Sequence, residues 1–181
     1  MHNGRPDRKG AMPLADEETA ASARDGTPIV LRLVRPDDEP LLHDLFAHMS
    51  AEDIRLRFFA PMRALSHSLA DRLVHLDPAR QVALVALYDG ATLGIARYST
   101  PPDTREAEFA VAVRSDWKGR GVGTLLINQL IEIAREAGIA ELTGTVLHEN
   151  RPMLDLCRAL GFTLHAHPSD ATAVLARKSL G

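Results

Sequence analysis

Hydrophobic and polar residues alternate along several short segments, in the pattern typical of strands with one buried face. These segments cover residues 29–35, 82–88, 92–99, 105–114, 141–147, 162–167 and 171–177. Between them, apolar residues recur every three or four positions, which predicts helices starting near residues 39, 50, 66, 122 and 150. The pattern predicts the order β-α-α-α-β-β-β-α-β-α-β-β.

The first 28 residues differ from the rest of the chain. Residues 1–28 contain no Phe, Tyr, Trp, Ile or Val, and their charged and small residues follow no period. Such a segment buries too little apolar surface to offset the entropy lost on ordering. We therefore expect a flexible tail over 1–28 and one folded domain over 29–181.

Composition narrows the class of protein. The 181 residues are 45% hydrophobic and 25% charged, as in an ordinary globular domain. A net charge of −3 argues against binding nucleic acid, which needs many cations. No apolar run approaches the ~20 residues of a membrane span. The single cysteine, Cys157, excludes an internal disulfide and favours a reducing, cytoplasmic location.

A glycine-rich segment, Lys118-Gly-Arg-Gly-Val-Gly123, separates a predicted strand from an amphipathic helix. Free backbone N–H groups at a helix start bind anions, and glycines let a phosphate approach the backbone. The Gly-Lys-Ser/Thr ending of a P-loop is absent, and Thr124 stands where a dinucleotide fingerprint needs glycine. The remaining alternatives are a different phosphate site and a turn needed only for packing.

Several motifs together resemble the GNAT superfamily of acyl-CoA-dependent N-acyltransferases. The loop matches that family's pyrophosphate motif as Lys118-x-x-Gly121-x-Gly123, with Lys in place of Gln or Arg. Asn150 opens the next short helix, and Leu160-Gly-Phe162 closes it, as in the family. The resemblance implies an α+β fold with α/β/α layers. Its central mixed, mostly antiparallel sheet has about seven strands, with helices on both faces.

Three stretches look more specifically like bacterial protein lysine acetyltransferases: 55–59, 107–116 and 153–162. This resemblance implies transfer from acetyl-CoA, or another short acyl-CoA, to an acceptor amine, with a protein lysine favoured. We also expect no metal, no nucleic acid and no membrane partner, and a monomer or homodimer. Acetylation of a small amine, or a weakly catalytic acyl-CoA sensor, are the alternatives.

The same resemblance implies the co-substrate site. The expected binding residues are Val111, Val113, Lys118, Gly119, Arg120, Gly121, Val122, Gly123, Thr124, Asn150, Met153 and Cys157. Lys118 and Arg120 are expected to face the phosphates, and a backbone N–H near Val111 the thioester, on a strand that bulges and splays. Asn150 either binds the pantetheine arm or only caps its helix.

Glu106 and Glu108 are the candidate general bases, since alternation places both on one strand face. The resemblance selects Glu108. Its neighbours Ala107 and Phe109 suggest desolvation, which would raise the pKa of this carboxyl and suit it to accept a proton. The alternative is a structural ion pair with Arg97 or Arg105.

Cys157 occupies the position where many family members have a tyrosine acid. It is read as a proton donor, as a nucleophile without a clear histidine partner, or as a small buried residue. Only His165 and His167 have spacing for a shared strand face, which does not make a metal site. Arg55 and Arg57 border the expected acceptor groove, where they steer an acidic substrate or are simply solvated.

Overall fold

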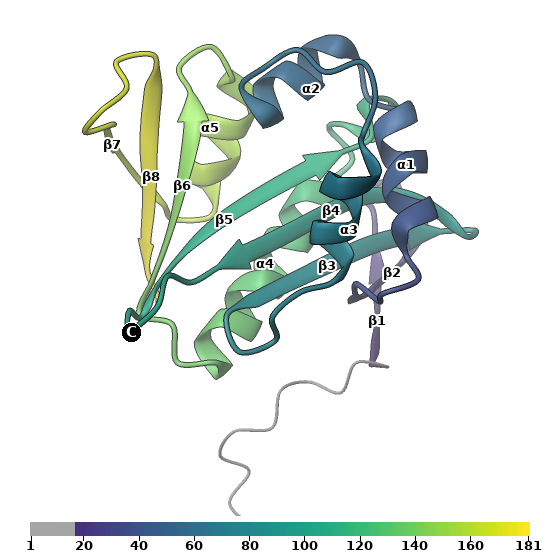
Figure 1. Cartoon of the computed structure of the whole chain (residues 1–181), viewed down its shortest axis with the longest axis horizontal. Coiled ribbons are helices and arrows are strands. Elements are labelled where there is room, and N and C mark those ends of the chain that lie inside the picture. The colour runs from purple at the N-terminus through teal and green to yellow at the C-terminus, as the bar shows by residue number, and fades with distance from the viewer. Residues whose placement is uncertain (1–16) are drawn as a thin grey trace, which may run out of the picture.

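The computed structural model describes residues 17–181, in which eight strands and five helices form one layered body (Figure 1). The strands are β1 (Glu18–Ser22), β2 (Pro28–Leu33), β3 (Gln81–Tyr88), β4 (Ala91–Ser99), β5 (Glu106–Val113), β6 (Glu141–Leu147), β7 (Thr163–Ala166) and β8 (Ala173–Ser179). The helices are α1 (Glu39–Ala47), α2 (Ala51–Phe58), α3 (His67–Val74), α4 (Val122–Glu136) and α5 (Arg151–Ala159), with a 3₁₀ turn at Ser115–Trp117.

One sheet contains all eight strands, in the order β1-β2-β3-β4-β5-β6-β8-β7. Only β5 and β6 are parallel, and the other neighbours are antiparallel. The predicted order of elements and the mixed, mostly antiparallel sheet are confirmed. The sheet has one strand more than expected.

The additional strand is β1, which lies within the segment expected to be a flexible tail. Its residues pair with β2 from Glu18↔Arg32 to Ser22↔Pro28. The expectation of a flexible tail is therefore wrong from Glu18 onward, and residues 1–16 lie outside the described residues. The physical reason is that an edge strand gains main-chain hydrogen bonds from its neighbour and needs few apolar side chains.

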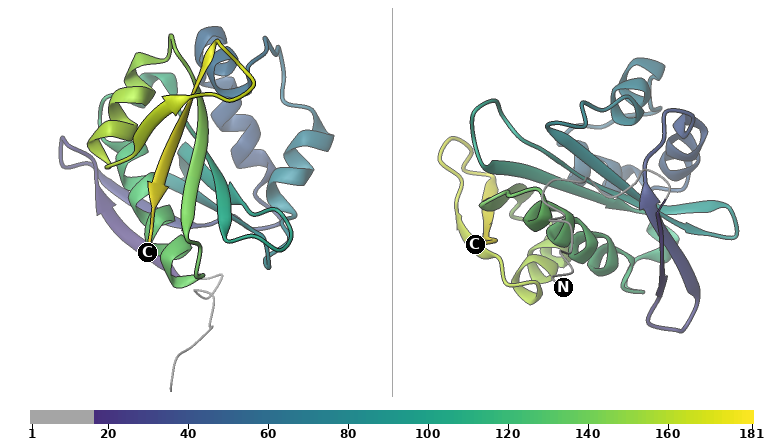
Figure 2. Two further views of the ribbon diagram at one scale, coloured as in Figure 1. Left: turned by 90° about the vertical axis from the view of Figure 1, so that its left-hand side faces the viewer. Right: turned by 90° about the horizontal axis from the view of Figure 1, so that it is seen from below.

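Helices cover both faces of the sheet, as Figure 2 shows from two sides. The larger core lies under α4 and α5 and includes Leu126, Leu130, Phe109 and Phe162. A smaller core lies on the other face, under α1, α2 and α3. No helix within residues 17–181 is long and apolar enough to cross a bilayer.

The parallel strands β5 and β6 begin side by side and then separate, as Figure 1 shows. Their pairing covers only three positions, from Glu106↔Glu141 to Glu108↔Thr143. Both strands continue past the last pair, so one edge of β5 has no ladder partner there among the described residues. The splayed pair opens the middle of the sheet.

Candidate active site

A cavity of about 530 Å³ occupies the opening between β5 and β6. This volume is in the range of small-molecule and cofactor sites. Its walls come from β5 and β6, the glycine-rich loop, α2, α5 and the turn after β1. Among the residues that line it are Arg24, Asp53, Arg57, Glu108, Val111, Val113, Lys118, Gly119, Gly121, Val122, Gly123, Thr124, Asn150 and Met153.

The glycine-rich loop ends at the start of α4. Its glycines are needed for different physical reasons. Gly119 and Gly121 have φ of +75° and +90°, in the left-handed region that favours glycine. A Cβ on Gly123 would lie 3.2 Å from the side chain of Leu156, so this glycine permits close packing of α4 against α5. The backbone N–H groups of the first helical turn have no acceptor within the helix and lie at the cavity wall. The loop therefore offers an anion site.

Arg24, in the turn after β1, reaches this loop although it lies almost 100 residues earlier in the chain. Its backbone N–H donates to the carbonyl of Arg120 over 2.9 Å, and its guanidinium Nη1 donates to the carbonyl of Gly119 over 3.3 Å. Its side chain also packs where a Cβ of Gly121 would be. The turn thus brings a cation to the anion site, which the sequence analysis missed.

Lys118 lines the cavity but is held by a carboxylate from α2. Its Nζ lies 2.5 Å from Oδ1 of Asp53. The carboxylate of Asp53 also accepts a hydrogen bond from the Ser115 hydroxyl, over 2.5 Å, while its backbone N–H donates to the hydroxyl of Ser50, which caps α2. Burial alone would raise the pKa of Asp53, but the bonds from Lys118 and Ser115 outweigh burial and lower it. This ion pair ties α2 to the loop.

Arg120, expected to face the phosphates, is not among the residues that line the cavity. Its guanidinium stacks over the ring of Trp117, 4.4 Å from the centroid, and lies 3.7 Å from the Asp25 carboxylate. The structure thus holds this side chain against Trp117 and Asp25, outside the cavity wall. Arg24, by contrast, is among the residues that line the cavity.

The free edge of β5 carries backbone N–H groups that face the opening. Arg114 donates to Leu93 of β4, and residues alternate in an antiparallel ladder, so Ala112 and Ala110 also bond to β4. The N–H groups of Val111 and Val113 therefore point toward β6, at positions where β6 has already separated. The expected splay is confirmed. The expected bulge is not, because the β4–β5 register is continuous.

Glu108 is the last residue of β5 that pairs with β6, and its side chain lines the cavity. Its side chain is exposed, whereas Ala107 and Phe109 are buried on the opposite face. The expected desolvation by these two neighbours is thus wrong, because alternation turns them away from the carboxylate. Neither structural ion pair forms within 4.0 Å: Arg105 donates to the carbonyl of Gly138 instead, and Arg97 acts on Glu108 only from farther away.

Asn150 and Met153 both line the cavity from α5. Asn150 caps the helix, because its Oδ1 accepts from the N–H of Met153 over 3.3 Å. The cap uses the oxygen and leaves the amide hydrogens of Asn150 to donate elsewhere. Helix capping and a contact with a ligand in the cavity are therefore compatible.

Cys157 is fully buried in the larger core and is not among the residues that line the cavity. Burial raises the pKa of its thiol to about 11. A neutral thiol is a poor nucleophile, and a fully buried thiol that does not line the cavity is not positioned to donate a proton there. The expectation that Cys157 contacts the co-substrate is therefore wrong, and the reading as a small buried residue is the one that the structure supports.

Outside this cavity, three side chains of types that can bind a metal lie close together. The sequence analysis did not group them. Oε1 of Glu39 accepts from both His43 and His67, which ties α1 to α3. Their ligand atoms lie within 4.8 Å of one another. The hydrogen bonds from His43 and His67 lower the pKa of the Glu39 carboxyl. The hydrogen bonds from His43 and His67 to Glu39 already explain why these three side chains lie together.

The sheet, the splayed strands and the loop at a helix start together define an acyl-CoA-dependent N-acyltransferase. The chain belongs to the Acetyltransferase (GNAT) family, whose family model matches residues 42–162.

Relatives support this assignment along most of the chain. Acetyltransferase PA5475 of Pseudomonas aeruginosa is 32% identical over 163 residues, which is 88% of each protein. The GNAT domain of S. lividans PAT is similar in structure, with a TM-score of 0.84 and 30% identity over 90% of this chain and 96% of that domain. The L-amino acid N-acetyltransferase AaaT of Escherichia coli is 29% identical over 102 residues, 54% of this chain and 62% of that protein.

Proposed function

We propose that this protein transfers the acetyl group of acetyl-CoA directly to the Nε atom of a protein lysine, in a ternary complex. The observation that carries the proposal is the position of Glu108. Its exposed carboxylate stands at the point where the pairing of β5 with β6 ends, next to the free N–H edge of β5. An acceptor amine at Glu108 and a thioester along that edge are therefore within reach of each other.

The loop is the site proposed for the co-substrate phosphates. The N–H groups of Val122, Gly123 and Thr124 bind the pyrophosphate, assisted by Arg24 and by the dipole of α4. The pantetheine arm then runs along the free edge of β5. There the N–H of Val111 donates to the thioester carbonyl and stabilises the oxyanion that forms on attack.

In the proposed reaction, Glu108 accepts a proton from the acceptor ammonium, directly or through a water molecule. The free amine attacks the carbonyl carbon, a C–N bond forms, and the C–S bond of the tetrahedral intermediate breaks. The nitrogen releases its second proton to solvent, and the thiolate of CoA leaves and takes up a proton from solvent, since Cys157 is buried and does not line the cavity. Because no acyl group is passed to the enzyme, both substrates must be bound together.

Support for lysine as the acceptor comes from the motifs shared with bacterial protein lysine acetyltransferases. Two of these motifs lie at the site: 55–59 ends helix α2, and 107–116 contains Glu108. Glu108 lines the cavity and is exposed to solvent, which suits an amine on a side chain presented by another protein. The reduced state implied by a single cysteine agrees with a cytoplasmic substrate pool.

The test is incubation with labelled acetyl-CoA and a panel of acceptors, followed by mass spectrometry of the products. The panel contains lysine peptides, peptides with only an α-amine, free amino acids and polyamines. We expect Nε-acetyl-lysine in the peptides, and intersecting initial-velocity lines when both substrates are varied. Parallel lines would contradict direct transfer.

A second set of outcomes separates the alternatives. If only free amino acids or polyamines are acetylated, the protein is a small-molecule N-acetyltransferase. A blank panel with measurable binding of CoA would instead favour a sensor module, and both results contradict lysine acetylation.

A further inference from the structure

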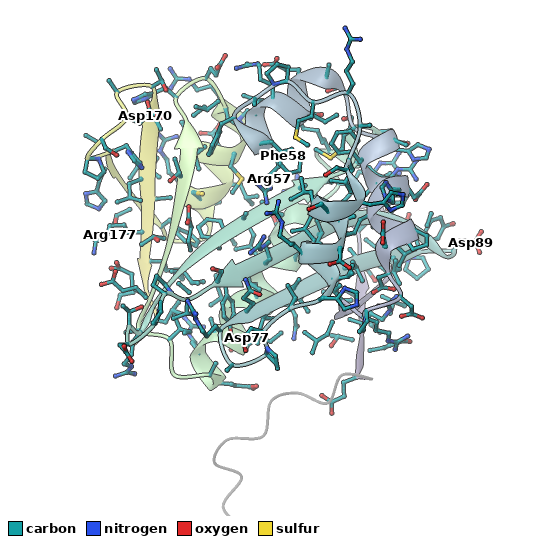
Figure 3. All side chains as sticks on the ribbon, in the orientation of Figure 1. Arg57, Phe58, Asp77, Asp89, Asp170 and Arg177 are labelled. Carbon is teal, nitrogen blue, oxygen red and sulfur yellow. The ribbon has the colours of Figure 1, made fainter. Side chains whose placement is uncertain are left out.

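Three charged side chains meet on the sheet face that α2 covers. Arg97 pairs with Ala110 and Ser99 with Glu108, so Arg97 and Glu108 lie diagonally on the same face of β4 and β5. Arg57, in the last turn of α2, lies over that face, as the label in Figure 3 shows. Its guanidinium interacts electrostatically with both Arg97 and Glu108.

Neither guanidinium has a carboxylate partner in contact. Both side chains are partly buried. Within residues 17–181, Arg57 stacks over Phe58 at 4.9 Å, and neither guanidinium forms a hydrogen bond or an ion pair within 4.0 Å. Burial, together with Arg97, lowers the pKa of Arg57 to about 10, while Glu108 opposes this shift. The Arg57 guanidinium therefore remains positively charged at neutral pH, and no carboxylate within residues 17–181 contacts it.

The positive charge of three other arginines of this protein is neutralised by a carboxylate in contact. Each has a carboxylate within 3.0 Å: Arg32 with Asp38, Arg55 with Glu52 and Glu149, and Arg177 with Glu141. Arg55 is only two residues before Arg57 on α2, yet it faces the rim of the site and is fully paired. Within residues 17–181, Arg57 and Arg97 have no contact of this kind, although both are partly buried beside Glu108.

We propose that Arg57 and Arg97 bind a carboxylate of the acceptor, so that the preferred acceptor carries an acidic group next to the amine that is acetylated. The proposal rests on the proposed function, because Arg57 lines the same cavity as Glu108. Arg97 lines a small second pocket, which Arg57 also lines, so Arg57 connects the two. Two guanidiniums and Glu108 together carry a net charge of +1, which repels an acceptor bearing only an ammonium. An acceptor with both charges places its ammonium at Glu108 and its carboxylate at the arginines, where bidentate hydrogen bonds form.

A carboxylate next to an amine occurs in two kinds of acceptor. One is the α-carboxylate of a free amino acid, and the other is an acidic side chain beside a lysine in a protein. The test therefore uses matched pairs of acceptors. One arm compares L-methionine and L-glutamate with their α-amides, and the other compares lysine peptides that have Asp or Asn next to the lysine. In at least one arm we expect kcat/KM to be about tenfold higher for the acceptor with the carboxylate, a difference of ~1.4 kcal/mol.

Variants assign this preference to the two arginines. In Arg57→Gln and Arg97→Gln, the preference should fall to about twofold or less, through a higher KM for the carboxylate acceptor. Arg135→Gln, which removes an exposed charge on α4, is the matched control and should keep the preference. The ratio of two acceptors on one enzyme sample does not depend on the fraction that is folded, and Arg57→Lys and Arg97→Lys, which keep the charge, should retain part of it.

The outcomes separate this inference from the proposed function. A wild-type ratio near one in both arms, with acceptors that are acetylated, overturns the inference and leaves the acetyltransferase function standing. An unchanged ratio in Arg57→Gln and Arg97→Gln overturns it as well. A complete absence of acetylation, with CoA bound, overturns the proposed function and with it this inference.

Discussion

The guanidinium of Arg24 donates a hydrogen bond to the carbonyl oxygen of Gly119, so the turn after the first strand touches the glycine-rich loop. The contact joins segments 95 residues apart in the sequence. It places a cation beside backbone N–H groups that already favour a phosphate. The N-terminal strand therefore contributes directly to the proposed co-substrate site.

Arg24→Gln tests this contribution. We expect the variant to bind CoA about fivefold more weakly, or ~1 kcal/mol, since the side chain is exposed and its charge is screened. S-acetyl-pantetheine lacks the nucleotide phosphates, so its KM should not change. Arg120→Gln removes the same charge from a side chain outside the cavity and should change CoA affinity less than twofold. Equal losses in both variants would contradict the assignment.

Phe109 of β5 packs closely against Gly144 of β6, where the two strands have separated. A Cβ at position 144 would lie 2.5 Å from the ring of Phe109. We expect Gly144→Ala to lower the free energy of unfolding by about 2 kcal/mol and the Tm by roughly 4–8 °C. Thermal denaturation measures this effect. In the Phe109→Leu background the same change should be much milder, and additive effects would contradict the steric account.

Cys157→Ala should leave turnover within about twofold of wild type and destabilise the fold by ~1 kcal/mol, because the thiol is a core group. Iodoacetamide should alkylate Cys157 only after unfolding, since burial raises the pKa of the thiol to about 11. The rate of alkylation at pH 8, with and without urea, measures this directly. A tenfold loss of turnover in a folded variant would restore a catalytic role for the cysteine.

The buried pair of Arg32 and Asp38 makes stability depend on pH. Burial alone would raise the pKa of Asp38, but hydrogen bonds from Arg32 and from the N–H of Arg35 lower it overall. This stabilisation is therefore complete above the unfolded pKa of about 3.9 and is lost as the pH falls through the lower folded pKa. Asp38→Asn should cost about 3 kcal/mol at pH 7.

The measurement is urea unfolding of the wild type and of Asp38→Asn from pH 7 to pH 2. The difference between the two proteins should stay constant down to about pH 4 and shrink below it. A difference that does not depend on pH would show that the carboxylate is not what stabilises this part of the fold.

The periodic pattern predicted every strand from β2 onward, because each has a face that must be buried. It did not predict β1, whose sequence Glu-Thr-Ala-Ala-Ser carries no such pattern and whose pairing uses the main chain alone. The contribution of Arg24 was missed for the same reason. A long-range contact made by a polar turn leaves no local signal in the sequence.

At the site, the glycine-rich loop and Glu108 were found from their motifs, and the cavity includes both. Alternation along β5 predicts that Glu108 lies on the face opposite Ala107 and Phe109. The apolar character of these two neighbours had instead suggested that the Glu108 carboxylate is buried. Arg57 and Arg97 lie on different elements, so only the fold brings them together beside Glu108. Register, separation of strands and contacts between helices are tertiary facts, and a single sequence does not specify them.

The most direct test of the whole account is the turnover of Glu108→Gln beside that of Glu106→Gln. Glu106 is also exposed on β5, two residues earlier, but it does not line the cavity. With Glu108→Gln we predict a loss of about 10²–10⁴-fold in kcat and a CoA affinity, measured by calorimetry, within about twofold of wild type. Glu106→Gln should keep wild-type turnover. Unchanged turnover in Glu108→Gln, or an equal loss in both variants, would contradict Glu108 as the general base.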